Sequence, residues 1–245
     1  MDDVKVIEEP QLEVESTLPW FINALLYPIS LHGMIQIGIF WFGLFLIGLL
    51  APFVFLLFRH YGSVIILLLR ILLIGYIAFY FGYCIYDSSR GGRRAPNIRA
   101  EHIPDKEDFI SQLFLILGCV AVCFWPVAVY YAFARRTDSI FWVLAGCGGF
   151  FFPMALLRGV LFDAFDALNP IFIIGSIFKT FLSYCVLILS FCVFGGLVAA
   201  IVFFLRRLPV LGFISNAVNL YLLFVAAHLL GRFYWWYKDK LDWGI

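Results

Sequence analysis

The stretch from Phe181 to Leu205 constrains the fold more than any other feature, because its 25 residues include no charged side chain. About 20 mostly apolar residues in a helix cross a hydrocarbon core of about 30 Å. A spanning segment must also satisfy its own backbone hydrogen bonds, which favours a helix. The six segments that meet this test are 33–58, 64–86, 109–133, 140–162, 181–205 and 210–231. Since the alternating ten-residue segments of a membrane barrel are absent, we expect an all-α integral membrane helical bundle with short interfacial helices.

The composition excludes several classes of soluble protein. Hydrophobic residues make up 64% of the 245 residues, and charged residues make up 13%. A soluble domain has about half apolar and about a quarter charged residues. The net charge of +1 gives no reason to expect a polyanionic partner such as nucleic acid. We therefore expect neither a disordered chain nor a large soluble catalytic domain.

The remaining segments are short and lie around the predicted spans. Residues 1–17 form an acidic tail without the basic start of a signal peptide. Residues 18–32 are too short to cross a bilayer and are broken by Pro19 and Pro28, so we expect an interfacial turn or short helix. The connection 87–108 is too short for a core of its own. Residues 18–245 are therefore predicted to form one transmembrane domain.

Positive charges predict the orientation of the bundle. With six spans, both ends of the chain lie on the same side as the 87–108 and 163–180 connections, and that side carries 10 of the 17 Lys and Arg residues. The opposite side carries 5, and Arg70 and Arg158 lie within spans. Because cytoplasmic loops are enriched in Lys and Arg, we expect both termini to be cytoplasmic.

The main candidate site is a polar cluster at the end of the fourth predicted span. It consists of Arg158, Asp163, Asp166 and Asn169. An ion pair here would line a path for a substrate or protons. Alternatively, the cluster is a hinge at the membrane boundary, with Arg158 extended toward headgroup water. Asn169 followed by Pro170 predicts the start of a new helix.

Secondary candidates are the polar residues inside two other spans. Arg70 is a functional candidate as an intramembrane charge, or its long stem reaches the interface. Asn216 and Asn219 lie three residues apart and are expected to hydrogen-bond to neighbouring helices. His228 could act as a ligand or proton carrier, but no second histidine is suitably spaced. The aromatic and basic segment 232–243, just beyond the last predicted span, is expected to anchor that helix end at the headgroups.

We predict no catalytic, metal or cofactor site. The six cysteines fall within or beside apolar runs, where cysteine behaves as a small hydrophobic residue. Gly146, Gly148 and Gly149 are not followed by the Lys and Ser or Thr of a phosphate loop. No nucleophile elbow is present either. The sequence therefore offers no positive case for an enzyme.

Four short motifs carry a family resemblance. They are Pro19-Trp20 with Leu26-Tyr27-Pro28, Gly75-Tyr76-Ile77 with Asp87-Ser88-Ser89, Pro104-Asp105 with Asp108-Phe109, and Asp166-Ala167-Leu168-Asn169-Pro170 with Ser176-Ile177. Together they resemble a group of bacterial polytopic membrane proteins with a domain of unknown function, distantly similar to the Yip-type proteins. The resemblance implies a bacterial inner-membrane protein of this topology. It implies no reaction, substrate or site.

Two hypotheses for function follow. The first is a non-enzymatic scaffold or assembly partner in the lipid bilayer, which contacts membrane or cytoplasmic proteins through the 87–108 loop. It follows from six spans and little soluble mass. The alternative is a small transporter or permease subunit with its polar centre at Arg158, Asp163 and Asp166.

Overall fold

The computed structural model describes residues 20–59, 61–96, 106–164, 168–207 and 214–244. The predicted acidic tail, 1–17, lies outside them, as does Asp166. Regular structure in the described part is entirely helical. The helices are α1 (Trp20–Leu26), the 3-10 turn η1 (Tyr27–Ile29), α2 (Leu31–Phe58), α3 (Gly62–Ser89), α4 (Lys106–Ala134), α5 (Ser139–Phe162), α6 (Pro170–Lys179), α7 (Phe181–Arg207) and α8 (Ile214–Leu241).

The all-α membrane class is confirmed. Among the described residues, six helices are long and apolar enough to cross a membrane: α2, α3, α4, α5, α7 and α8. The short helices α1 and α6 occupy the segments where the sequence predicts an interfacial element and a new helix. Asn169 caps α6, because its side-chain oxygen accepts a hydrogen bond from the Ile171 backbone N–H at 3.0 Å.

The last span differs most from its prediction. α8 continues as one helix to Leu241, whereas the sequence predicts an end at residue 231. The reason is burial: Phe233, Tyr234 and Leu241 are at most 6% exposed. These side chains pack into the protein core, so the first part of the aromatic segment extends the helix and is not solely an anchor at the headgroups.

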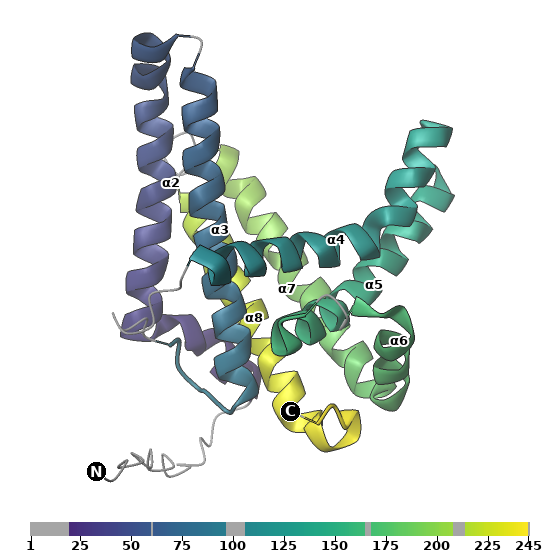
Figure 1. Cartoon of the computed structure of the whole chain (residues 1–245). Helices are drawn as coiled ribbons and strands as arrows, with labels where there is room; N and C mark the ends of the chain where they lie inside the picture. The colour runs from purple at the N-terminus through teal and green to yellow at the C-terminus, as the bar shows by residue number, and fades with distance from the viewer. Residues whose placement is uncertain (1–19, 60, 97–105, 165–167, 208–213, 245) are drawn as a thin grey trace, which may run out of the picture.

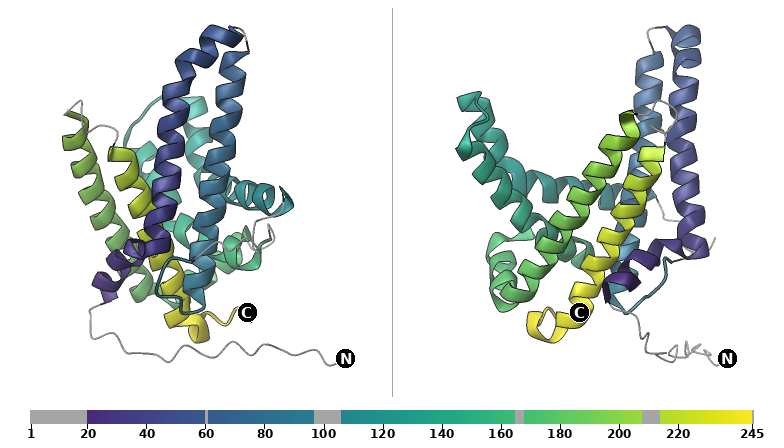
Figure 2. Two further views of the ribbon diagram at one scale, coloured as in Figure 1. Left: turned by 90° about the vertical axis from the view of Figure 1, so that its left-hand side faces the viewer. Right: turned by 180° about the vertical axis from the view of Figure 1, so that it is seen from behind.

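Two helical hairpins, α2–α3 and α4–α5, splay apart around α8. α8 packs along α3, and α2 lies beside both of them. The α2–α3 hairpin and the α4–α5 hairpin project toward the same end and diverge (Figures 1 and 2). α1, α6 and the end of α8 gather at the opposite end (Figure 1). The C-terminus of the chain also lies at this end (Figure 1).

The core is aromatic where α2, α3 and α8 meet. Tyr80 and Phe224 are fully buried, with ring centroids 5.0 Å apart, and Phe40 packs at 5.8 Å from Tyr80. Large apolar residues also cover the outside: Leu56 is 82% exposed, and Phe133 is 87% exposed. An exposed apolar surface of this kind is stable in lipid, where no water must be excluded.

The cysteines are free thiols in the described structure, but their surroundings differ. Cys84 and Cys119 are buried, as expected of small hydrophobic residues. Cys147 and Cys192 are exposed on α5 and α7. Both lie on helices with apolar outer faces, and a thiol is compatible with such a surface.

The opposite end of the bundle contains one well-defined helix cap. The Asp138 carboxylate caps α5 by accepting from the Phe141 backbone N–H at 3.2 Å, and it also accepts from the Tyr130 hydroxyl at 2.7 Å. The hydrogen bond from Tyr130 is the main cause that lowers the pKa of Asp138. Asp138 therefore stays ionised at the start of α5, where a negative charge is favoured.

Candidate functional site

The site begins with the close contact between α3 and α8. A Cβ atom at Gly231 would overlap the Ile85 carbonyl oxygen and the Ser88 Cβ atom. Glycine at this position therefore allows the two helix backbones to touch. The contact brings His228, nearly one turn earlier on α8, against the last turn of α3.

His228 is held rigidly at this contact. It is 4% exposed, and its Nδ1 atom lies 2.8 Å from the Ser88 hydroxyl oxygen. Its ring stacks on Tyr27 of η1, with centroids 4.0 Å apart and planes 18° apart. Burial raises the pKa of the Tyr27 phenol well above its usual value, so this ring stays neutral. The Tyr221 hydroxyl donates to the Leu25 carbonyl oxygen, which fixes α1 beside α8.

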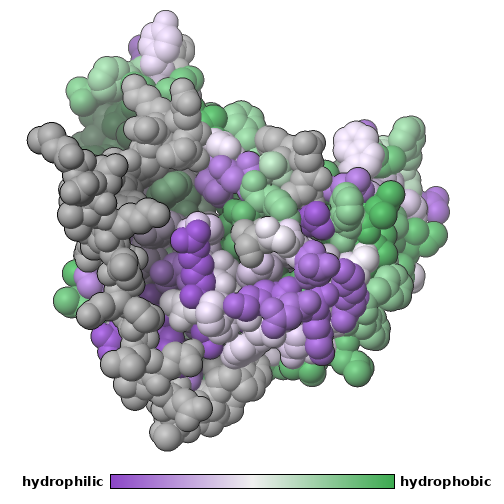
Figure 3. Space-filling view, turned by 60° about the horizontal axis from the view of Figure 1, so that its bottom comes forward, coloured by the Kyte–Doolittle hydropathy of each residue, from purple (hydrophilic) through white to green (hydrophobic). Residues whose placement is uncertain are grey.

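These elements surround a cleft of about 590 Å³ at the α1 end of the bundle. We call it the basic cleft. It is lined by Asn23, Ala24, Leu26, Ile29, Ser30, Arg93, Arg94, His228, Leu229, Arg232 and Trp236. None of these described lining residues is acidic, and three are arginines. Hydrophilic side chains gather on this end of the molecule (Figure 3).

A tight turn after α3 places Arg93 and Arg94 at the cleft. The Asp87 carbonyl oxygen accepts from the Arg90 and Gly92 backbone N–H groups at 3.1 and 3.0 Å. Gly91 has φ of 98°, a left-handed conformation that glycine adopts without strain. The chain therefore reverses direction within a few residues, and Arg93 and Arg94 are exposed at the cleft wall.

Arg232 approaches the same cleft from α8. It lies four residues after His228, so both side chains share one helix face. Its Nη1 atom donates to the Gly91 carbonyl oxygen at 3.5 Å, and its guanidinium lies 5.3 Å from the centre of the Trp236 ring. These contacts orient Arg232 at the cleft wall.

The cleft has the chemistry of an anion-binding site. Guanidinium groups match the oxygens of phosphates and carboxylates and form strong charge-assisted hydrogen bonds with them. His228, hydrogen-bonded to the buried Ser88, adds a polar group to the wall. Among the described residues, no group of three or more His, Cys, Asp or Glu side chains could hold a metal ion.

Arg158, the centre of the predicted cluster, has a different environment. Its guanidinium carbon lies 5.0, 4.7 and 5.5 Å from the ring centres of Phe162, Phe172 and Trp243. Its Nε atom is buried without a hydrogen-bond partner. We call this arrangement the aromatic cage. Arg158 thus contacts three aromatic rings, whereas the Asp163 carboxylate contacts Gln112.

The other members of the predicted cluster lie apart from Arg158. Asp163 ends α5 in a left-handed conformation with φ of 46°, and its Oδ1 atom accepts from Gln112 of α4 at 3.4 Å. Asn169 is exposed and serves as the cap of α6. Asp166 lies outside the described residues. The structure therefore does not join Arg158 and Asp163 into one polar centre.

The secondary candidates from the sequence also lie in different surroundings, some exposed and one buried. Arg70 is exposed on α3. Asn216 and Asn219 are exposed on α8, so they do not have the predicted place between neighbouring helices of this chain. Only His228 is buried and belongs to the basic cleft.

Sequence reasoning missed most of the cleft. It treated Arg93 and Arg94 only as charges that set orientation, and it placed Arg232 in the anchoring segment 232–243. It named Tyr27 and Ser88 only within the motifs of the family resemblance. One signal was present: His228 and Arg232 are four residues apart, on one face of the last span. The pairing of that face with Arg93 and Arg94 depends on the α3–α8 contact, which no local pattern reveals.

No family model, curated protein or solved structure matches this chain. The resemblance to the bacterial Yip-like membrane families therefore remains a proposal. The basic cleft is the observation from which a function can be argued.

Proposed function

We propose that this chain is a non-enzymatic, multi-pass membrane protein whose basic cleft holds an anionic group at one surface of the bilayer, and that it acts there as a scaffold or assembly partner. The observation that carries the proposal is the composition of the cleft wall. Arg93, Arg94, Arg232 and His228 come from distant parts of the chain and line one cleft, and none of the described lining residues is acidic. Three cations at one surface favour a phosphate or carboxylate group.

The scaffold part of the proposal concerns the connection after α3. The same turn that supplies Arg93 and Arg94 belongs to the 87–108 connection, which we propose as the contact for a membrane or cytoplasmic protein. An anion bound to these two arginines would hold the beginning of this connection against α8. Binding of the anion and binding of the partner would then favour each other.

We further propose that the basic cleft faces the cytoplasm of a bacterial cell, in its inner membrane. The excess of Lys and Arg on this side, 10 against 5, supports the orientation. The cytoplasmic leaflet also carries anionic lipids, which attract basic segments next to a membrane. The motifs shared with the bacterial polytopic group support the same location.

The test is anion binding by the full-length protein in a neutral detergent. The probe is glycerol phosphate, followed by the line width of its ³¹P NMR signal. Hydrogen bonds to a charged group contribute about 1.5–3 kcal/mol each. We therefore expect the combined variant Arg93→Gln, Arg94→Gln and Arg232→Gln to weaken binding by about tenfold or more.

The matched control is the double variant Arg135→Gln and Arg136→Gln. Both of these arginines are exposed, and they lie at the opposite end of the bundle. We expect this control to bind glycerol phosphate as the unmodified protein does, with the same thermal unfolding temperature. Equal binding by the cleft variant and the control would refute the proposal.

A further inference from the structure

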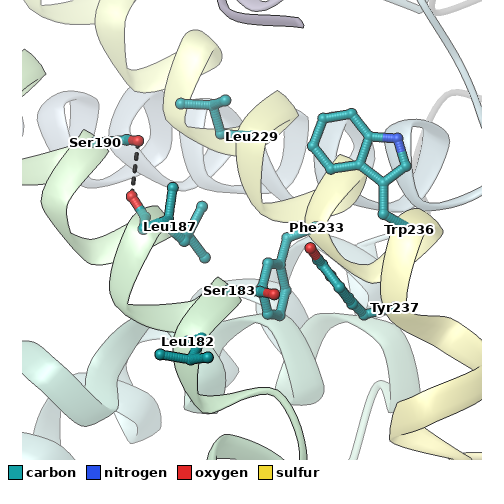
Figure 4. A pocket seen from close by; sticks show the side chains of 9 residues that line it. Leu182, Ser183, Leu187, Ser190, Leu229, Phe233, Trp236 and Tyr237 are labelled. Atoms are coloured by element: carbon teal, nitrogen blue, oxygen red, sulfur yellow. Dashed lines mark hydrogen bonds between the residues drawn. The ribbon is translucent and has the colours of Figure 1, made fainter.

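A second cavity adjoins the basic cleft, and its walls are apolar. It is a groove of about 450 Å³ between α7 and α8 (Figure 4). We call it the α7–α8 groove. α7 contributes Leu182, Val186 and Leu187 to its wall, and α8 contributes Leu229, Phe233 and Trp236.

The groove and the basic cleft are continuous along α8. Leu229 and Trp236 line both of them. His228 and Arg232 also line the cleft, whereas Phe233 lines the groove. One stretch of α8 therefore separates a cationic compartment from an apolar one, and its two shared side chains mark where they meet.

The groove is accessible from the side of the bundle. Leu182 is 81% exposed and Val186 is 54% exposed, and both lie on the outer face of a helix that could span the membrane. The Ser190 hydroxyl in the groove wall donates to the Val186 carbonyl oxygen of its own helix at 2.8 Å. This serine therefore does not require a polar occupant.

We propose that the occupant of the two compartments is one anionic phospholipid, with its phosphate among Arg93, Arg94 and Arg232 and one acyl chain in the α7–α8 groove. The inference rests on the proposed function, because the cleft must first bind an anion. A soluble phosphate would fill only the basic cleft. A phospholipid fits both compartments, because its negative headgroup matches the basic cleft and the apolar chain attached to it matches the adjoining groove.

The two compartments contribute differently to recognition. Lipid chains are as apolar as the groove, so transfer of a chain from the bilayer into the groove adds little affinity. Basic pockets between transmembrane helices select anionic headgroups. The cleft therefore determines which lipid binds, and the groove determines where its chain lies.

The experiment uses phosphatidylglycerol with a photoreactive diazirine in one acyl chain. The full-length protein is reconstituted in phosphatidylcholine nanodiscs, irradiated and analysed by peptide mass spectrometry. We expect labelling concentrated on Val186 and nearby groove residues of α7 and α8. A phosphatidylcholine probe with the same diazirine should label the outer surfaces of the spans without this preference. Identical patterns from the two probes would overturn the lipid assignment.

A matched pair of variants tests the groove itself. Val186→Trp fills the groove, whereas Val193→Trp makes the same change on an exposed residue, 60% accessible, that does not line it. We expect Val186→Trp to reduce labelling of α8 by phosphatidylglycerol to the level of the phosphatidylcholine probe. We expect Val193→Trp to leave this labelling unchanged.

The outcomes separate this inference from the proposed function. Both tryptophan variants should bind glycerol phosphate normally, because the arginines are intact. If the two variants label alike while the arginine variant loses glycerol phosphate, the lipid assignment fails and the anion site stands. If the arginine variant keeps glycerol phosphate, the proposed function itself fails.

Discussion

The aromatic cage and the basic cleft place arginines in opposite surroundings within one protein. In the cage, the guanidinium of Arg158 faces three rings, and Arg158 lines neither the basic cleft nor the α7–α8 groove. In the cleft, Arg232 lies over the Trp236 ring and borders a space of about 590 Å³ together with Arg93 and Arg94. The difference is whether the aromatic groups cover the cation or support it from one side.

This contrast fits a structural role for Arg158 and the proposed anion-binding role of Arg93, Arg94 and Arg232. The cage is closed by Trp243, whose Nε1 atom donates to the Ser176 hydroxyl oxygen at 3.0 Å and whose ring stacks on Tyr234 at 5.3 Å. Arg158 thus joins α5, α6 and the C-terminal residues. A cation covered by rings is stabilised by their π electrons and has little access for an anion.

The largest effect is expected from Gly231→Val, which tests whether the cleft depends on the α3–α8 contact. The added side chain overlaps Ile85 and Ser88, and overpacking of this kind costs about 1–3 kcal/mol. We expect a lower unfolding temperature and loss of glycerol phosphate binding. Gly195→Val on α7 is the control, because nothing lies within 4 Å of its added Cβ. Equal stability of the two variants would contradict the close contact.

Arg158→Ala tests whether the contacts of Arg158 in the aromatic cage stabilise the fold. Cation–π contacts contribute about 0.5–2 kcal/mol, so we expect a loss of about 1–2 kcal/mol in unfolding free energy. Arg158→Lys should recover part of the loss, since it restores a cation. Glycerol phosphate binding should be unchanged in both variants at temperatures where they are folded. Weakened anion binding would place Arg158 in the ligand site and break the distinction drawn here.

A smaller effect is expected from Ser88→Ala, which removes the hydroxyl beside His228. A buried hydrogen bond contributes about 1 kcal/mol, and its loss leaves Nδ1 of His228 without this partner. We expect a moderate decrease in stability and in glycerol phosphate affinity. Ser183→Ala on α7 is a suitable control because it lies outside the basic cleft. Unchanged stability and affinity would show that the Ser88 contact does not position His228.

The sequence predicts the fold far better than the site. Runs such as 181–205 identify spanning helices because hydrophobicity and length are properties of contiguous residues. Asn169-Pro170 predicts the start of α6 for the same reason, since a helix cap depends on neighbours in the chain. α8 is mispredicted at its end because the burial of Phe233 and Tyr234 depends on helices that are distant in sequence.

The candidate site could not be predicted from contiguous residues, as the helices could. Arg158 and Asp163 are close in sequence, which suggests an ion pair, but the end of α5 turns Asp163 toward Gln112 and leaves Arg158 against aromatic rings. Conversely, Arg94 and Arg232 are distant in sequence and line one cleft. Tertiary packing of α3 on α8 produces the site, and its only local sign is the spacing of His228 and Arg232.

The smallest effect is expected from the double variant Asn216→Leu and Asn219→Leu, which tests polar side chains outside both the cage and the cleft. Both residues are exposed on α8, and substitutions at exposed positions usually change stability by about 0.5 kcal/mol or less. We expect unchanged unfolding and unchanged labelling by phosphatidylglycerol in nanodiscs. The control is Leu220→Ala on the same helix, which removes a buried side chain and should cost about 2–5 kcal/mol. Asn side chains in membrane helices commonly hydrogen-bond across to another helix. A loss of stability that depends on protein concentration would therefore show that these residues contact a second chain, and that this face of α8 belongs with the functional surfaces.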